Sequence, residues 1–342
     1  MFRFTQVFRQ LIRSVSLLSV ITISSVQAAD KIDLIIDTDP GADDVVALLM
    51  ALASPEQLNV RAITTVAGNV RLDKTSRNAR LAREWAGRED VPVYAGAPRP
   101  LVRSPIYAEN IHGKEGLTGV PVHEPAKGLE SINAVNYLID TLRAAKPGSV
   151  TIAMLGPQTN LALALTQAPD IARGIKEVVV MGGAHFNGGN ITPVAEFNIY
   201  ADPHAADVVL KSGVKLTYVP LDVTHKILTS EARMKQIAAL GNTAGKLVGD
   251  ILNEYVKGDM EHYGLPGGPV HDASVIAYLL NPELFTGRDV NMVVDTREGP
   301  TSGQTIADWY NTLNQPKNVF WVEDGDAQGF FDLLTSRLGR LK

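Results

Sequence analysis

Residues 32–50 read IDLIIDTDPGADDVVALLM and set the pattern for the rest of the chain. The apolar start, residues 32–36, predicts a buried strand because it is short and rich in β-branched side chains. The apolar end, residues 45–50, predicts a helix, and Pro40 with Gly41 between the two is typical of a turn. A strand that leads directly into a helix is the repeating unit of α/β proteins.

The same alternation continues along the chain. It predicts an α/β fold with an open, mostly parallel sheet and helices on both faces, which is a Rossmann-like core. No repeat, low-complexity tract or linker interrupts it, so we expect one domain over residues 29–342. The predicted strands are residues 32–36, 60–66, 91–94, 150–155, 177–181, 215–219, 290–294, 303–307 and 318–322, and the predicted helices are residues 43–53, 73–86, 132–145, 159–167, 203–211, 231–240, 243–257 and 273–280.

Four aspartates, Asp37, Asp39, Asp43 and Asp44, gather where the first strand is predicted to end. Carboxylates this close repel and raise one another's pKa, whereas a hard divalent cation accepts several of their oxygens and keeps them ionised. Open α/β sheets bind ligands at this edge. An alternative is that Asp43 or Asp44 only caps the following helix. The number of carboxylates favours a metal site.

Residues 1–28 have the features of a secretory signal peptide. Three arginines form a basic start, residues 17–23 form a short apolar core, and Val26 and Ala28 favour cleavage after Ala28. A membrane anchor is the alternative, but the apolar core is much shorter than the roughly 20 residues that span a bilayer. We therefore expect export to a bacterial periplasm, with no membrane contact after cleavage.

The composition excludes several classes of function. Loss of the three leader arginines changes the formal charge from −5 to −8, and no basic stripe is present. Nucleic-acid binding through phosphate neutralisation is therefore not expected. The chain has no cysteine, which excludes disulfides, a thiolate nucleophile and a lipid-modified cysteine at the cleavage site.

Further polar groups follow predicted strands or open a predicted helix. Three long loops, residues 96–128, 182–196 and 221–230, also follow strands, so we expect them at the same edge of the sheet as the aspartates. Taken singly, these groups have ordinary explanations: Asn69 as a turn residue, Asp272 as a helix cap and His271 as a packed histidine.

Together the motifs resemble those of the inosine/uridine-type nucleoside hydrolases, whose signature D-x-D-P-G-x-D-D corresponds to residues 37–44. The resemblance extends in order over nearly the whole chain after residue 28. It implies a nucleoside hydrolase fold, a tightly bound Ca²⁺ and hydrolysis of the N-glycosidic bond of ribonucleosides to ribose and free base. The matching segments are DTDPGADD (37–44), AITTVAGN (62–69), IHG (111–113), LGPQTN (155–160), MGG (181–183), AEFN (195–198) and VHD (270–272).

The resemblance also implies a ligand set for Ca²⁺. Asp39, Asp44 and Asp272 would bind through their side chains and Leu155 through its backbone carbonyl, an all-oxygen set of the kind that Ca²⁺ prefers. Many relatives have Thr at the position of Leu155, which matters little for a backbone ligand. Asp39 would also act as the general base on a calcium-bound water.

Contacts with a ribonucleoside substrate follow from the same resemblance. His271 would donate a proton to the leaving base, since histidine titrates near neutral pH, and relatives of this kind are commonly dimers or tetramers. The implied substrate-binding residues are Asp43 for the 2′-hydroxyl, Asn198 for the 3′-hydroxyl, Asn190 and Glu196 for the 5′-hydroxyl, and Asn69, His112 and Met181 around them.

Contacts with the nucleobase stay open. Tyr255, His262 and Tyr263 belong to a helix that folds over the substrate in the family, and Trp309 is a further candidate. Ordinary packing explains aromatic residues on an amphipathic helix equally well. The sequence therefore does not rank the nucleobases.

Two other functions match parts of this sequence. Asp37-Thr38-Asp39 imitates the catalytic pair of haloacid-dehalogenase-type phosphatases, but Pro40-Gly41 is awkward in the loop of that class. An exported, calcium-dependent nucleoside-binding protein without turnover is the second alternative. It would have no need of a base such as Asp39 or an acid such as His271.

Overall fold

The computed structural model of the protein describes residues 31–342, except for the side chains of residues 258, 259, 262 and 263. The predicted signal peptide lies outside the described residues, as do the side chains of His262 and Tyr263. The strands of the described range are β1 (Ile32–Thr38), β2 (Leu58–Thr65), β3 (Val93–Ala95), β4 (Val150–Met154), β5 (Ile175–Met181), β6 (Leu216–Val219), β7 (Phe285–Val294), β8 (Thr305–Asp308) and β9 (Val319–Gly325).

These strands form one sheet in the order β3-β2-β1-β4-β5-β6-β9-β7-β8. Every pairing from β3 to β9 is parallel, and β7 runs antiparallel to both β9 and β8. The prediction of an open, mostly parallel sheet is confirmed. The antiparallel strands are confined to one edge.

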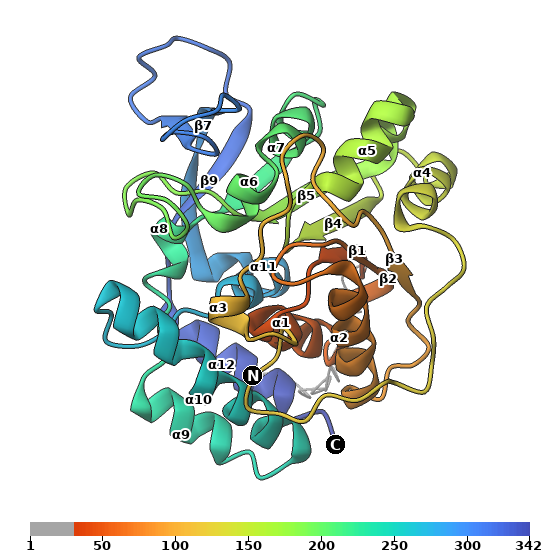
Figure 1. The fold of residues 1–342 in the computed structure, drawn as a ribbon, viewed down its shortest axis with the longest axis vertical. Coiled ribbons are helices and arrows are strands. Elements are labelled where there is room, and N and C mark those ends of the chain that lie inside the picture. Colours follow the sequence, from red (N-terminus) through yellow and green to blue (C-terminus); the bar gives the residue numbers. More distant parts are fainter. Residues whose placement is uncertain (1–30) are drawn as a thin grey trace, which may run out of the picture. The chain divides into compact units, whose positions relative to one another are not determined.

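Helices cover both faces of the sheet (Figure 1). In Figure 1, α4, α5 and α7 lie on one side of the strands and α1, α2 and α12 lie on the other. The helices are α1 (Ala42–Leu52), α2 (Leu72–Trp85), α3 (Glu109–His112), α4 (Ala134–Ala144), α5 (Thr159–Gln167), α6 (Phe197–Ala201), α7 (Pro203–Leu210), α8 (Leu221–Thr224), α9 (Glu231–Ala238), α10 (Thr243–Tyr263), α11 (His271–Leu280) and α12 (Ala327–Leu338), with 3-10 turns at Pro169–Gly174 and Pro282–Leu284.

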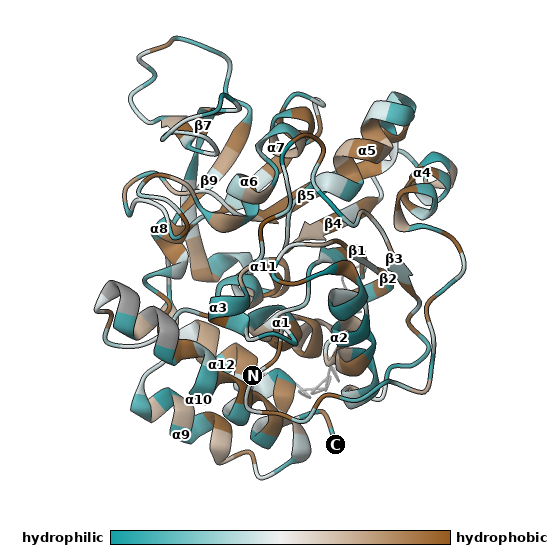
Figure 2. Ribbon diagram, viewed as in Figure 1, coloured by the Kyte–Doolittle hydropathy of each residue, from teal (hydrophilic) through white to brown (hydrophobic). Residues whose placement is uncertain are grey.

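The core consists of two apolar layers separated by the sheet. Successive side chains of a strand point to opposite faces, so Leu34 and Ile36 pack with α1, α10, α11 and α12, whereas Ile35 packs with α4, α5 and α7. Figure 2 shows apolar residues concentrated on the strands and on the helix surfaces that meet them. Burial on both faces explains why the run 32–36 is almost continuously apolar.

Most predicted elements are present, and the differences have physical reasons. The short helices α3 and α8 lie within two of the long loops, and α6 directly follows the third. All three helices are too short for a periodic pattern. Helix α12 was not predicted, although Asp326 accepts hydrogen bonds from the backbone of Gln328 and Gly329 as a helix cap and Phe330 and Leu334 share one face. Strand β7 begins at Phe285, five residues before the predicted start.

Lys31–Lys342 cluster as a single unit by their internal contacts. Among these residues, none of the helices combines the length and the apolar character that crossing a bilayer requires.

Candidate active site

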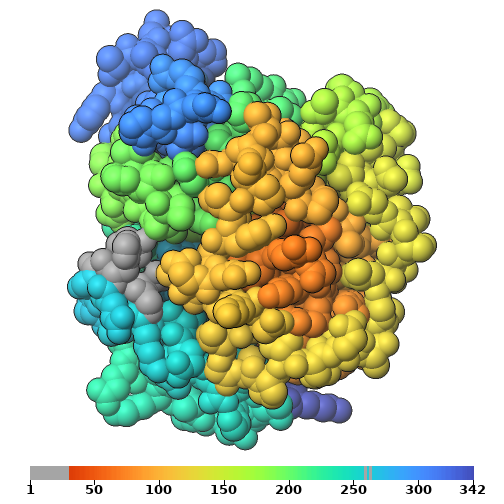
Figure 3. All heavy atoms as spheres, in the orientation of Figure 1, coloured from red at the N-terminus to blue at the C-terminus, as the bar shows by residue number. Residues whose placement is uncertain are grey.

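A pocket opens at the carboxyl edge of the sheet, where the first two long loops meet. In Figure 3 the surface is hollowed between α3 and the 182–196 loop. The start of α11 forms part of the lining, and α10 contributes Tyr255. The lining residues are Asp43, Asn69, Ala108, Asn110, Ile111, His112, Leu155, Met181, Asn190, Ile191, Glu196, Phe197, Asn198, Tyr255, His271 and Asp272.

The structure brings the predicted site residues together. All of them line this pocket except Asp39 and Asp44, which are fully buried. Both of these carboxylates contact Asn69, which does line the pocket. Residues that are far apart in the chain therefore meet at one edge of the sheet, as expected for an open α/β fold.

Asp44 both caps α1 and faces the acidic cluster. Its Oδ2 accepts hydrogen bonds from the backbone N–H of Gly41 at 2.9 Å and from Nδ2 of Asn69 at 2.9 Å. The Thr38 hydroxyl donates to Oδ1. The capping role that was weighed against a metal site is thus real for Asp44, and the two roles are compatible because a carboxylate has about four lone-pair sites.

Asp39 lies in a tight cradle made by two glycines. An added Cβ would lie 2.0 Å from Oδ2 of Asp39 at Gly68 and 2.2 Å from its Oδ1 at Gly156. Oδ2 accepts a 2.6 Å hydrogen bond from the backbone N–H of Asn69. Oδ1 is buried and has no hydrogen-bond partner among the described residues. One carboxylate oxygen is thus held in place while the other stays available.

The carboxylates of Asp43, Asp44 and Asp272 form the tightest acidic group, because one oxygen of each lies within 4.8 Å of the others. Burial raises the pKa of Asp272 well above its usual value, and the charges of Asp43 and Asp44 raise it further. Burial and then the charge of Asp44 do the same to the pKa of Asp39. Such a cluster is costly as a set of anions, and a cation removes the cost.

The donor set fits a hard divalent cation such as Ca²⁺. Every candidate ligand is an oxygen, and the unpartnered Oδ1 of Asp39 is a buried acceptor in need of a partner. Two details differ from the predicted ligand set. Asp43 rather than Asp39 completes the closest group of carboxylates, and the Leu155 carbonyl already accepts a 2.7 Å hydrogen bond from Asn198. A carbonyl oxygen has a second lone pair, so this bond leaves room for another contact.

Two histidines approach the pocket with their Nδ1 atoms already engaged. Nδ1 of His112 accepts a 3.1 Å hydrogen bond from the backbone N–H of Ala42, so Nε2 carries the proton of that ring. The ring also stacks on Tyr255, with centroids 5.3 Å apart. Nδ1 of His271 lies 2.8 Å from the Thr224 hydroxyl. Ala42 and Thr224 lie 70 and 47 positions from the histidines that they contact, so the sequence does not predict either hydrogen bond.

Burial lowers the pKa of His271 well below its usual value, and the nearby His225 and His112 lower it further. Burial also lowers the pKa of His112 to about 4. Both rings are therefore neutral at pH 7 in this structure. This differs from the expectation that His271 titrates near neutrality, because a buried imidazolium loses its hydration.

The predicted ribose contacts also organise their own backbone. Glu196 caps α6, and its oxygens accept hydrogen bonds from the backbone of Asn198, Ile199 and Gly183. Burial nevertheless raises the pKa of Glu196 to about 7. Nδ2 of Asn198 donates to the carbonyls of Leu155 and Met181 and so joins the ends of β4 and β5.

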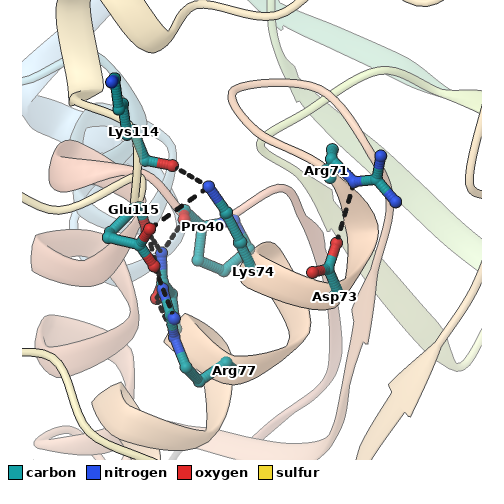
Figure 4. Close-up of polar contacts among 8 residues, drawn as sticks. Pro40, Arg71, Asp73, Lys74, Arg77, Lys114 and Glu115 are labelled. Atoms are coloured by element: carbon teal, nitrogen blue, oxygen red, sulfur yellow. Dashed lines mark hydrogen bonds and ion pairs between the residues drawn. The ribbon is translucent and has the colours of Figure 1, made fainter.

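An ion-pair cluster outside the pocket anchors the segment that carries His112 (Figure 4). Glu115 pairs with Arg77 at 2.7 Å and with Lys74 at 3.3 Å, both from α2. The buried Asn78 donates to the carbonyl of Glu115 at 2.9 Å and to that of Pro40 at 3.0 Å. The side-chain amide of Asn78 thus holds both the turn at Pro40 and the segment that carries His112.

Two further aspartates shape the site: Asp37, which the sequence groups with the other strand-end carboxylates, and Asp222, to which the sequence assigns no role. Asp37 is fully buried, where it accepts hydrogen bonds from Thr64 and Asn160. Asp222 accepts hydrogen bonds from three successive backbone N–H groups of the 182–196 loop. Asp222 stands three residues after the end of a predicted strand, and that position was the only signal that could have identified it.

The fold and the pocket together are those of an α/β enzyme with a buried acidic cluster. A sequence model of the inosine-uridine preferring nucleoside hydrolases matches residues 34–332. The chain belongs to this family, whose members hydrolyse ribonucleosides and are metal-dependent. The phosphatase alternative is therefore wrong.

Named relatives and solved structures agree with this assignment. The pyrimidine-specific ribonucleoside hydrolase RihA of Citrobacter koseri is 44% identical over 305 residues, which cover 88% of this chain and 96% of the relative. An uncharacterized protein of Schizosaccharomyces pombe is 44% identical over 90% of this chain and 99% of its own length. The purine-preferring ribonucleoside hydrolase from Gardnerella vaginalis has a TM-score of 0.82 at 33% identity, covering 90% of this chain and 98% of that one.

Proposed function

We propose that this enzyme hydrolyses the N-glycosidic bond of ribonucleosides to ribose and free base, with Asp39 as the general base. The observation that carries the proposal is the buried Oδ1 of Asp39, which has no hydrogen-bond partner in the part of the chain that the structure describes. An oxygen in this position can accept a proton from an attacking water. Burial, and then the charges of Asp44 and Asp43, raise the pKa of Asp39 and so increase its affinity for that proton.

Asp39, Asp44 and Asp272 with the Leu155 carbonyl would hold Ca²⁺. When bound, the ion supplies a Lewis acid that lowers the pKa of a water ligand and binds the sugar diol. Asp43 belongs to the same oxygen cluster and would accept a hydrogen bond from the 2′-hydroxyl. The four carboxylates would thus share three tasks: binding the metal, binding the sugar and accepting the proton of the attacking water.

Each partner has a defined task in the reaction. Asp39 takes a proton from the water that attacks C1′, while the C1′–N bond breaks through an oxocarbenium-like state. The bonding pair stays with the nucleobase, to which Nε2–H of His271 donates a hydrogen bond. The departing base takes up one proton through solvent, which balances the proton that Asp39 removes from the water. The remaining ribose contacts are Asn198 for the 3′-hydroxyl, Asn190 and Glu196 for the 5′-hydroxyl, and Asn69, Met181 and His112 around the sugar.

Pyrimidine ribonucleosides are the proposed preferred substrates. Support comes from the RihA relatives, which are named pyrimidine-specific and are 43–44% identical. The purine-preferring structural relative is more distant, at 33% identity. Initial rates with uridine, cytidine, inosine and adenosine test this order, and a higher kcat/KM for the purine nucleosides would contradict it.

The substitution Asp39→Asn tests the general base. Because asparagine has nearly the same shape but cannot accept the proton, we expect kcat to fall by about 10²- to 10⁴-fold. Release of reducing sugar from uridine measures this, and calcium binding by calorimetry shows whether the metal site survives. Asp73→Asn, an exposed acid of α2, is the matched control. Full turnover by Asp39→Asn would contradict the role of Asp39 as general base. If the wild type bound nucleosides without releasing ribose, the binding-protein alternative would be favoured.

We also propose that residues 1–28 direct export to the periplasm and that the mature chain forms a homodimer or homotetramer. A periplasmic product beginning at Ala29 supports export, whereas an uncleaved cytoplasmic chain would contradict it. Sedimentation of the purified enzyme measures the assembly, and a monomer at micromolar concentration would rule it out.

A further inference from the structure

The short helix α8 contributes no residue to the described lining of the pocket, but it contacts His271 through the side chain of Thr224. Thr224, the last residue of α8, is fully buried, and its hydroxyl lies 2.8 Å from Nδ1 of His271. His271 opens α11, 47 positions further along the chain, and lines the pocket. The Thr224 hydroxyl, which does not line the pocket, thus contacts the His271 ring, which does.

The direction of this hydrogen bond follows from the surroundings of Thr224. Among the described residues, Nδ1 of His271 is the hydrogen-bond partner of the Thr224 hydroxyl. A buried hydroxyl proton requires an acceptor, so with a neutral ring the hydroxyl donates to Nδ1 and the ring proton resides on Nε2. If the ring gains a second proton, the same hydroxyl oxygen accepts from Nδ1–H. Nε2 carries a proton in both cases.

We infer that Thr224 is a positioning residue, which orients the His271 ring so that Nε2–H faces the leaving nucleobase. The inference rests on the proposed function, in which His271 is the donor to that base. As the C1′–N bond breaks, its electron pair stays on the base, and Nε2–H forms a hydrogen bond to the atom that gains the negative charge. Thr224 itself touches neither base nor sugar in this arrangement.

The alternative orientation of the ring is disfavoured by the same contact. Turning the imidazole over would replace Nδ1 by a carbon atom opposite the hydroxyl and leave a buried donor unsatisfied. His225 packs beside the ring, with centroids 5.6 Å apart and planes tilted by 49°. The ring is therefore held by a hydrogen bond from one residue of this segment and by packing against the next.

The substitution Thr224→Val tests the inference, because valine keeps the shape and removes the hydroxyl. We expect kcat on uridine to fall by about 10- to 100-fold, part of the roughly 10²- to 10³-fold that one well-placed donor contributes. Turnover of p-nitrophenyl riboside should change little, since nitrophenolate leaves as a stable anion without a donor. Thr224→Ser, which retains the hydroxyl, should restore most of the loss on uridine.

The outcomes separate this inference from the proposed function. Equal losses on both substrates would show a merely structural role, and no loss on either would show that the hydroxyl does not orient the ring. Either result overturns the inference while hydrolysis stands. If the wild type releases no ribose from any nucleoside, the proposed function itself fails. His271→Phe, measured in parallel, should lose activity on uridine and keep it on the nitrophenyl substrate.

A measurement on the wild type keeps the inference testable if Thr224→Val does not fold. Long-range ¹H–¹⁵N spectra of protein labelled with ¹⁵N-histidine distinguish the two ring tautomers, and His271→Phe assigns the signal. We expect a proton on Nε2 and an unprotonated Nδ1 for His271. A neutral ring with its proton on Nδ1 would overturn the inference.

Discussion

Glu196 illustrates how one side chain serves both the fold and the site. Its carboxylate caps α6 and lines the pocket at the same time. Only 2% of the residue is exposed, so the loss of hydration outweighs three backbone hydrogen bonds and the pKa rises from 4.5 to about 7. Burial is the larger of the two effects, and stability must therefore depend on pH.

The sign of that dependence follows from proton linkage. Between pH 4.5 and 7 the folded state holds more protons on Glu196 than the unfolded state, so this contribution to stability is present at low pH and is lost as the pH rises. We expect the unfolding free energy of the wild type, measured by urea denaturation, to fall by about 1–3 kcal/mol between pH 5 and pH 8 because of this group.

Glu196→Gln isolates this effect, because glutamine does not titrate. The difference in unfolding free energy between wild type and variant should change with pH in the direction given above. Saturating calcium in both samples keeps the acidic cluster in one charge state. A difference that is the same at pH 5 and pH 8 would refute the raised pKa of Glu196.

Helix α8 shows how a short element organises two sides of the pocket. Thr224 at its end reaches His271, and Asp222 in its first turn binds the 182–196 loop. Oδ1 of Asp222 accepts from the backbone of His185, Phe186 and Asn187, and Oδ2 accepts from the indole of Trp321 at 3.1 Å. The loop that carries Asn190 is thereby tied to α8 and β9.

Asp222→Asn should loosen that loop. The asparagine amide would oppose the Trp321 indole donor, and a lost hydrogen bond to a charged group is worth about 1.5–3 kcal/mol. Because the 182–196 loop carries predicted sugar contacts, we expect KM for uridine to rise about tenfold or more and kcat to change less. The factor follows because about 1.4 kcal/mol corresponds to a tenfold change in affinity. Asp207→Asn, which breaks an exposed ion pair with Lys211 on α7, is the control and should leave KM unchanged. A normal KM for Asp222→Asn would show that the loop does not depend on this carboxylate.

At the scale of the whole molecule, the proposed cation site joins segments that are far apart in the chain. Asp44 belongs to α1 and Asp272 to α11, and these two helices pack against each other within the same apolar layer. Buried carboxylates that repel one another oppose this packing. A bound cation should therefore stabilise the fold as well as enable the reaction.

Removal of the metal should lower the melting temperature of the enzyme. A ligand present at about 100 times its Kd adds about 2.7 kcal/mol to the folded state. Calorimetric scans with a chelator and with added Ca²⁺ measure the difference. Asp272→Asn is the control and should abolish the response to Ca²⁺. Equal melting temperatures of the wild type with and without Ca²⁺ would contradict a structural contribution of the ion.

The local sequence sufficed for much of the fold and for most of the predicted residues that line the pocket. The alternation of short β-branched runs with helical patterns predicted the parallel sheet, because periodicity along one segment shows which faces must be buried. The antiparallel placement of β7 and β8 was not predictable, since it depends on which edge of the sheet remains open. Helix α12 was missed although its cap and apolar face are visible in the sequence.

By itself the sequence determined which chemical groups lie at the ends of the strands, because a strand that ends in Asp37-Thr38-Asp39 delivers those carboxylates to the sheet edge in any parallel arrangement. Only the tertiary structure decided the neighbours of each group. The unpartnered oxygen of Asp39 and the pairing of Thr224 with His271 depend on contacts between distant segments. Such contacts follow from strand order and helix packing, which no local pattern encodes.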